Sequence, residues 1–247
     1  MAVRVRRRGW SALRDWRARW WAQQQKDREN QLEVWGGLID SHRVVLFSDA
    51  IFAIGITLLS LKLEIRSGLK GSAFVEEFYD LLPSLGAYAL SYVILGLLWL
   101  IHHRIFSVVS RVDLSILVRN LAFLGLIATM PFPVRLLGDY PDRPLAVGTY
   151  AFVFIVAMLL QWSMWREVTS PRRRELVSEP VSEEIRRGFG RIIASMALVF
   201  GALVPLVIFA PRLAGLIWGI GLLIQVTIAL INRRWMIPFV RWHSRTQ

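Results

Sequence analysis

The chain alternates between six long apolar blocks and shorter polar segments that are rich in arginine. A helix needs about 20 mostly apolar residues to cross a bilayer core of roughly 30 Å, and each block has about that length. The pattern therefore predicts six transmembrane helices and an all-α polytopic membrane protein. The predicted spans cover residues 44–63, 81–101, 114–137, 145–165, 192–210 and 213–231. Prolines predict local breaks: Pro131 and Pro133 should bend or end the third span, and Pro205 should kink the fifth.

This pattern divides the chain into a basic segment over residues 1–40, a six-helix transmembrane domain over 41–235 and a tail over 236–247. The first segment is rich in arginine and in tryptophans at roughly helical spacing. This is typical of an amphipathic helix that lies among anionic lipid headgroups, and a disordered basic arm is the alternative. The segment has no apolar stretch of the kind found in signal peptides.

The formal net charge is +12, which in a soluble protein would suggest a nucleic-acid partner. Here most of the 30 Lys and Arg residues lie before the first span, after the second, after the fourth and after the sixth. The positive-inside rule then places both termini in the cytoplasm. We expect a multi-pass protein of the cell (plasma or inner) membrane, with no nucleic-acid partner. The absence of cysteine excludes disulfides and thiolate metal sites.

Polar residues lie in or against the start of the first span, although polar groups are costly in hydrocarbon. Ser48 and Asp49 could cap a helix that starts near Leu46, since such side chains accept bonds from free N–H groups. Alternatively, they bond to neighbouring helices, and Arg43 is expected to pair with a neighbouring element. Thr57 lies mid-span, where a threonine hydroxyl most often bonds to the carbonyl four residues earlier.

The same span carries an aliphatic stripe. The stripe consists of residues that share one face of a helix with 100° per residue, namely Phe47, Ile51, Ile54, Leu58 and Leu61. On the residues alone, this stripe indicates lipid contact or core packing, because most membrane helices offer one.

The second and third predicted spans hold further polar groups. Trp99 has an indole N–H that needs a partner when buried. His102 and His103 are adjacent and point about 100° apart, so they make a poor chelating pair. One of them is expected to bond to a carboxylate such as Asp49 or to face the interface. In the third span, the polar pair is Arg119 and Asn120. Asp49 and Asp113 are the expected partners of the Arg119 guanidinium.

Three stretches share features with one family. "RVVLFSDAIFAIGITLL" resembles the R-x-x-x-F-S-D-A signature of the transmembrane protein 175 family of potassium channels. "LLWLIHHRIF" is similar to the second helix of that family, with its tryptophan and histidine, and "RNLAFLGLIATMPFP" to its third helix. The match covers residues 43–137, whereas the later spans agree only in number and hydropathy.

The resemblance implies six helices per repeat and potassium conduction, with K⁺ as the permeant ion and no cofactor. Because this chain has one repeat, it resembles the prokaryotic members, which are homotetramers whose first helix lines the pore. Carried over, the pore constriction falls on Ile54, Leu58 and Leu61, and the threonine associated with selectivity falls on Thr57. The signature network falls on Arg43, Phe47, Ser48, Asp49, Trp99, His102, His103, Arg119 and Asn120.

One apolar helix cannot enclose a pore, whereas four copies around an axis can, and a ring of aliphatic side chains can gate by dewetting. The T-V-G-Y-G filter of ordinary potassium channels is missing from the sequence. The runner-up interpretation is a small secondary transporter, but the first two predicted spans carry no acidic residue at mid-depth. An enzyme is not expected, since no nucleophile triad or metal-ligand spacing is visible.

Overall fold

The computed structural model describes residues 20, 23–24, 39–178 and 181–231. The chain divides into two units, Met1–Ile39 and Asp40–Gln247. In the first unit, the described residues Trp20, Gln23 and Gln24 are helical. The predicted amphipathic helix of residues 1–40 and the tail of residues 236–247 lie almost wholly outside the described residues, so both stay predictions.

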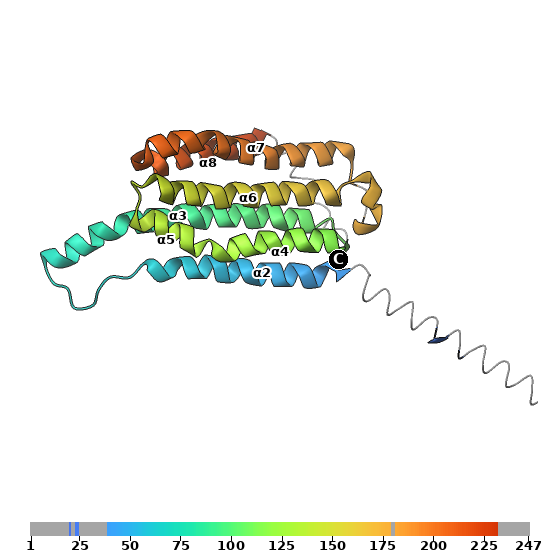
Figure 1. Cartoon of the computed structure of the whole chain (residues 1–247), viewed down its shortest axis with the longest axis horizontal. Helices are drawn as coiled ribbons and strands as arrows, with labels where there is room; N and C mark the ends of the chain where they lie inside the picture. The colour runs from blue at the N-terminus through green and yellow to red at the C-terminus, as the bar shows by residue number, and fades with distance from the viewer. Residues whose placement is uncertain (1–19, 21–22, 25–38, 179–180, 232–247) are drawn as a thin grey trace, which may run out of the picture. The chain divides into compact units, whose positions relative to one another are not determined.

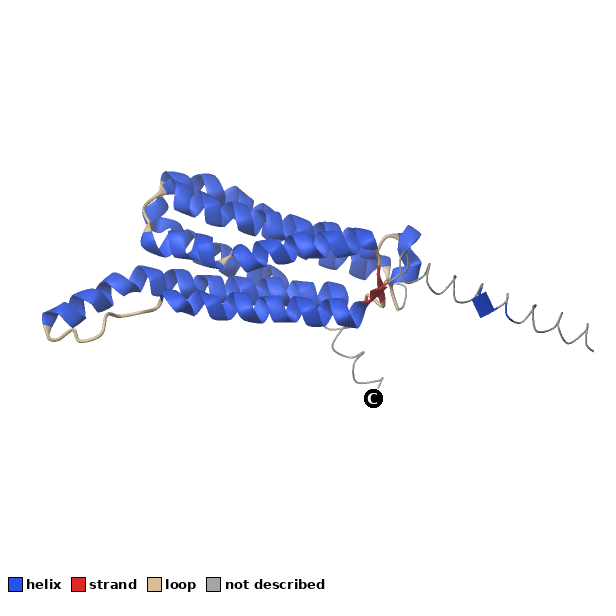
Figure 2. Ribbon diagram, turned by 60° about the horizontal axis from the view of Figure 1, so that its bottom comes forward, coloured by secondary structure: helices blue, strands red, loops and turns tan. Residues whose placement is uncertain are grey.

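The second unit is a bundle of helices (Figures 1 and 2). Its α-helices are α2 (Ser41–Leu58), α3 (Ser72–Phe106), α4 (Leu114–Thr129), α5 (Pro131–Asp139), α6 (Pro144–Val168), α7 (Glu183–Phe209) and α8 (Ala214–Ile231). Three 3₁₀ turns follow α2, α6 and α7, namely η1 (Leu59–Lys62), η2 (Pro171–Leu176) and η3 (Pro211–Leu213). The two-residue strands β1 (Ile39–Asp40) and β2 (Arg111–Val112) pair with each other.

The described helices are those of a polytopic membrane protein, as the apolar blocks predicted. Five helical segments are long and apolar enough to cross a membrane, and they are Ser41–Leu61, Ser72–Phe106, Leu114–Asp139, Pro144–Val168 and Glu183–Phe209. The sixth predicted span coincides with α8, in which the described apolar stretch Leu216–Ile228 is shorter.

Two helices begin well before their predicted spans. α3 starts at Ser72 rather than at residue 81 and contains Pro83, and α7 starts at Glu183 rather than at residue 192. Hydropathy marks only the part of a helix that can lie in hydrocarbon, whereas the backbone hydrogen bonds of the helix continue into the polar residues before it. The Ser182 hydroxyl caps α7 by accepting a bond from the Ile185 N–H at 3.3 Å. The first turns of α3 project beyond the rest of the bundle (Figures 1 and 2).

The third predicted span breaks where its prolines predicted. α4 ends at Thr129 and α5 begins at Pro131, with Met130 at the junction. Proline lacks an N–H and its ring clashes with the preceding turn, so it suits the first position of a new helix. Pro205, in contrast, lies inside α7, which continues to Phe209.

The order of packing leaves α2 at one edge of the bundle. α2 contacts α3 and α4, α6 contacts α4, α5 and α7, and α7 contacts α8. In Figure 1, α2 lies along one side and α7 and α8 along the other. One side of α2 therefore has no covering helix among those of the described part of the chain.

Candidate functional site

The two sides of α2 differ in burial. Val44, Ser48, Phe52 and Gly55 are buried against the bundle and recur every three or four residues. Gly55 brings α2 close to α4, since a Cβ there would lie 3.5 Å from Cγ2 of Ile127. This close packing fixes which face of α2 turns toward the bundle and which turns away.

The predicted constriction residues lie on the uncovered side. The exposed fractions of Ile54, Leu58 and Leu61 are 55%, 40% and 64%, and Phe47 lies on the same side at 52%. Thr57 is also exposed, and its hydroxyl donates to the Ile54 carbonyl at 2.9 Å, three residues earlier rather than the expected four. An aliphatic stripe with one threonine is thus free to meet another surface.

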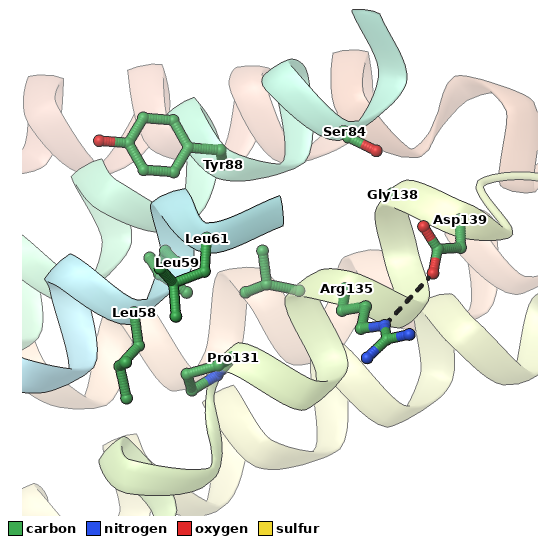
Figure 3. Close-up of a pocket in the computed structure, with 10 residues that line it drawn as sticks. Leu58, Leu59, Leu61, Ser84, Tyr88, Pro131, Arg135, Gly138 and Asp139 are labelled. Carbon is green, nitrogen blue, oxygen red and sulfur yellow. Dashed lines mark ion pairs between the residues drawn. The ribbon is translucent and has the colours of Figure 1, made fainter. Parts of the chain in front are cut away.

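A pocket of about 170 Å³ lies where α2 passes into η1, and its lining includes Leu58 of α2 and Leu61 of η1. Figure 3 shows its lining, in which α3 contributes Tyr88 and Ser84 and α5 begins at Pro131. Arg135 and Asp139, which lie one turn apart on α5, also line the pocket and pair with each other at 3.5 Å. Ile54 does not line this pocket.

A chain of buried hydrogen bonds joins three helices on the covered side of α2. The Ser48 hydroxyl bonds to the Val44 carbonyl at 2.8 Å, and the Asn120 Nδ2 donates to Ser48 Oγ at 3.1 Å. The Asn120 Oδ1 then faces Nε2 of His102 at 2.8 Å. Since an amide oxygen only accepts, the His102 Nε2 carries the proton in this arrangement. Ser48, Asn120 and His102 are all at most 1% exposed.

Aromatic rings enclose the His102 imidazole. The ring stacks on Phe106 with centroids 4.5 Å apart and on Phe123 at 5.5 Å, and Phe52 of α2 is tilted against it at 5.8 Å. Such rings hold the imidazole plane in place and exclude water from its bond to Asn120. Buried polar bonds in a dry environment are costly to break, so the register of α2, α3 and α4 is well defined here.

Asp49 takes part in a second, less buried contact. The Trp99 indole N–H donates to Asp49 Oδ1 at 2.8 Å, and the His103 ring stacks on Trp99 with centroids 5.4 Å apart. The structure thus gives Asp49 the Trp99 indole as its partner, and not the Arg119 guanidinium.

Two residues of the predicted network lie elsewhere. Arg43 is exposed and makes no hydrogen bond or ion pair within the described ranges. Arg119 bonds to Ser115 and pairs with Glu167 of α6 at 3.5 Å, not with Asp49 or Asp113 as expected. Arg173 of η2 lies between Glu167, at 3.1 Å, and Asp113. The expectation failed because Glu167 and Arg173 come from distant segments that packing brings to this end of the bundle.

The capping interpretation of Ser48 and Asp49 was wrong. α2 begins at Ser41, and Asp40 is its N-cap, with its carboxylate accepting from the His42 N–H at 3.0 Å. Ser48 and Asp49 are therefore well inside the helix, where backbone N–H groups are already bonded. Their side chains serve contacts between helices.

Sequence reasoning missed several buried polar groups. The Gln161 Nε2 of α6 donates to the Leu98 carbonyl of α3 at 2.8 Å, and the Ser91 hydroxyl meets the Tyr150 hydroxyl at 3.1 Å. The sequence could have revealed Gln161 as a contact between helices, because it is a lone amide inside an apolar span. It could not have revealed the Ser91–Tyr150 pair, since both side chains are common in membrane helices.

The geometry can be compared with known proteins. Residues 43–131 match the family model described as "Endosomal/lysosomal potassium channel TMEM175". A potassium channel of Streptomyces collinus is 34% identical over 53% of this chain and 65% of its own length. A potassium channel of Chamaesiphon minutus is 30% identical over 65% of this chain and 85% of its own length. This chain belongs to the TMEM175 family. The matched residues contain all of α2 beyond His42 together with the Ser48, Asp49, Trp99, His102 and Asn120 contacts.

A solved structure supports the family membership at the level of the fold. It is described as the crystal structure of a lysosomal potassium-selective channel TMEM175 homolog from Chamaesiphon minutus. The TM-score is 0.61 at 26% identity, and the match covers 78% of this chain and 97% of that chain. The TMEM175 arrangement of helices therefore extends well beyond the stretch that the family model matches.

Proposed function

We propose that this TMEM175-family chain forms a potassium-permeable cation channel, in which four copies place the uncovered face of α2 around a central pore. One observation carries the proposal: α2 lies at the edge of the bundle with its polar residues bonded inward and its aliphatic stripe uncovered. The names of the two bacterial relatives, both potassium channels, support the choice of ion.

Ile54, Leu58 and Leu61 would form the constriction. Rings of aliphatic side chains make a narrow passage that empties of water and so closes, and small widenings let water and ions return. The Thr57 hydroxyl already donates to Ile54, so its oxygen keeps a free lone pair for a passing cation. In this proposal, selectivity for potassium does not depend on the carbonyl filter of ordinary potassium channels.

The inward face of α2 would serve as the anchor of the pore helix. The Ser48–Asn120–His102 chain and the Asp49–Trp99 bond attach α2 to α4 and α3. A rotation of α2 that removed Ile54 from the axis would break buried hydrogen bonds, each costing about 1–3 kcal/mol. The signature residues would thus define the pore without touching the ion. Arg43 and Phe47, which are exposed, would face the pore entrance or a neighbouring subunit.

The proposed topology follows the charge distribution. The arginine-rich loops, including residues 169–187, would lie in the cytoplasm with both termini, in the plasma or inner membrane. The basic residues 1–40 would then meet anionic headgroups on that side.

The runner-up, a small secondary transporter, would need a substrate site near the middle of the membrane. The 170 Å³ pocket lies at the end of α2, and its two charged residues, Arg135 and Asp139, pair with each other. This pocket therefore does not favour the alternative.

Purified protein in liposomes tests the proposal through separate potassium, sodium and proton fluxes. We expect passive potassium flux that exceeds sodium flux and that rises when Leu58 is changed to alanine, because a smaller ring holds water more easily. Phe152→Ala is the matched control, since Phe152 is 65% exposed on α6. Absence of potassium flux from correctly folded protein, or flux that saturates and requires a counter-ion, would contradict the channel.

A further inference from the structure

A basic pocket lies apart from α2, where α6 ends and α7 begins. Its volume is about 750 Å³, and its lining includes Trp162, Arg166, Thr169, Arg186, Arg187 and Arg191. Glu167, adjacent to Arg166, pairs with Arg119 of α4, and the next residue, Asn120, bonds to Ser48 of α2. The pocket therefore lies at the same end of the bundle as these contacts of α2. We refer to these six residues as the arginine pocket.

Positive charge in the arginine pocket exceeds the negative charge that neutralises it. Arg186 and Arg187 share one carboxylate, that of Glu183, at 2.6 and 2.5 Å. The Arg166 guanidinium lies over the Trp162 ring, 4.7 Å from its centroid, and the Arg191 Nε faces the Arg187 carbonyl at 3.4 Å. Within the described ranges no carboxylate pairs with Arg166 or Arg191. Four arginines therefore line the pocket, and of these the described ion pairs join only Arg186 and Arg187 to a carboxylate.

The wall of the pocket is held in place by Trp165. Its indole N–H donates to the Arg186 carbonyl at 2.9 Å, and its ring meets Phe189 edge-on with centroids 4.8 Å apart. α7 lies close to this ring at Gly190, where a Cβ would come within 3.4 Å of the indole. The separation of α6 and α7 is thus set by buried packing, and this packing fixes the backbone positions that carry the arginines.

Apolar surface leads away from the pocket toward the membrane. On α7, Ala194 lines the pocket, and Leu198, one turn further on, is 73% exposed. On α6, Leu159 lies almost one turn before Trp162 and is 49% exposed. An anion with hydrocarbon tails fits this combination of charge and apolar surface, whereas a free anion would use only the charge.

We propose that the arginine pocket binds the phosphate headgroup of an anionic phospholipid of the cytoplasmic leaflet. Arginine forms paired hydrogen bonds to phosphate oxygens, and basic pockets between membrane helices on the cytoplasmic side suit anionic headgroups. In the proposed topology Trp162, near the cytoplasmic end of α6, would lie at the depth where indoles favour the interface. The acyl chains would follow Leu159 and Leu198. The choice of leaflet rests on the proposed topology, but the binding does not rest on conduction.

Lipid retention tests the proposal on the full chain. The protein is purified in mild detergent, incubated with phosphatidylglycerol or phosphatidylcholine, and analysed by native mass spectrometry for bound lipid. The test variant is Arg166→Gln/Arg191→Gln. The control is Arg111→Gln/Arg172→Gln, which removes the same charge from exposed positions outside the pocket. We expect roughly tenfold less retained phosphatidylglycerol in the test variant and wild-type retention in the control.

Two other results of the lipid-retention experiment would contradict the proposal. Equal losses in both variants would show diffuse electrostatic attraction, and displacement of the lipid by millimolar inorganic phosphate would show a free-anion site; either result overturns the proposal. If the glutamine variant fails to fold, Arg166→Lys/Arg191→Lys retains the charge but loses the paired geometry. Weakened phosphatidylglycerol retention in that variant supports the site, and unchanged retention contradicts it.

Discussion

The Trp99 indole of α3 donates a 2.8 Å hydrogen bond to Oδ1 of Asp49, and this bond joins α3 to the proposed pore helix. Asp49 lies one residue after Ser48, whose side chain bonds instead to Asn120 of α4. Two adjacent residues of α2 therefore bind two different helices. A helix held from two directions cannot rotate about its axis without losing one of these bonds.

Replacement of Asp49 tests this anchor. Asp49→Ala removes the acceptor of the indole, whereas Asp49→Asn keeps an amide oxygen that can still accept. We expect Asp49→Ala to lower the free energy of unfolding by about 1–3 kcal/mol and to reduce potassium flux, with Asp49→Asn closer to wild type. Thermal unfolding in detergent and liposome flux measure both effects. Normal flux in Asp49→Ala would show that the bond does not orient the pore.

Replacement of Asn120 tests the chain of buried hydrogen bonds between Ser48 and His102. Asn120→Leu keeps a side chain branched at the same position but leaves the Ser48 and His102 side chains without their partner in a dry site. We expect a loss of about 1–3 kcal/mol in stability. Val118→Ala on the same helix is the control, since Val118 is exposed and should matter little. A similar small loss in both variants would show that the chain contributes little to stability.

Gly138 tests the contact of α5 with α3. A Cβ at this position would lie 2.9 Å from the Ser84 Oγ and 3.0 Å from the Ser84 Cα. Gly138→Ala must therefore push the two helices apart, at a cost of about 1–3 kcal/mol. Gly125→Ala is the matched control, because nothing lies within 4 Å of a Cβ there. Unfolding curves of the two variants should differ, and coincident curves would contradict the close approach.

Glu167 tests the ion pairs at the loop end of the bundle. Its carboxylate meets Arg119 at 3.5 Å and Arg173 at 3.1 Å. These groups are partly exposed, so we expect Glu167→Gln to cost about 1 kcal/mol or less and the cost to shrink at high salt. Unfolding measured at two ionic strengths checks this. A large loss that salt leaves unchanged would contradict a partly screened network.

Much of this architecture could be predicted from the pattern of apolar residues, because each membrane span is a local feature. The break at Pro131 was also local. In contrast, the pairing of Arg119 with Glu167 and Arg173 depends on how α4, α6 and η2 pack, and no spacing in the sequence encodes it. The side of α2 that Ile54 occupies could be predicted by helical geometry, but its exposure depends on α2 lying at the bundle edge.

Silver block of a single thiol tests the central claim most directly. The chain contains no cysteine, so an Ile54→Cys variant carries one thiol, at the proposed constriction. Phe152→Cys, on the exposed face of α6, is the control, and thiol modification is verified separately by loss of maleimide labelling. We predict that Ag⁺ abolishes potassium flux in liposomes of Ile54→Cys and leaves wild type and Phe152→Cys conducting. Undiminished flux through Ile54→Cys with its thiol fully modified would contradict a pore lined by α2.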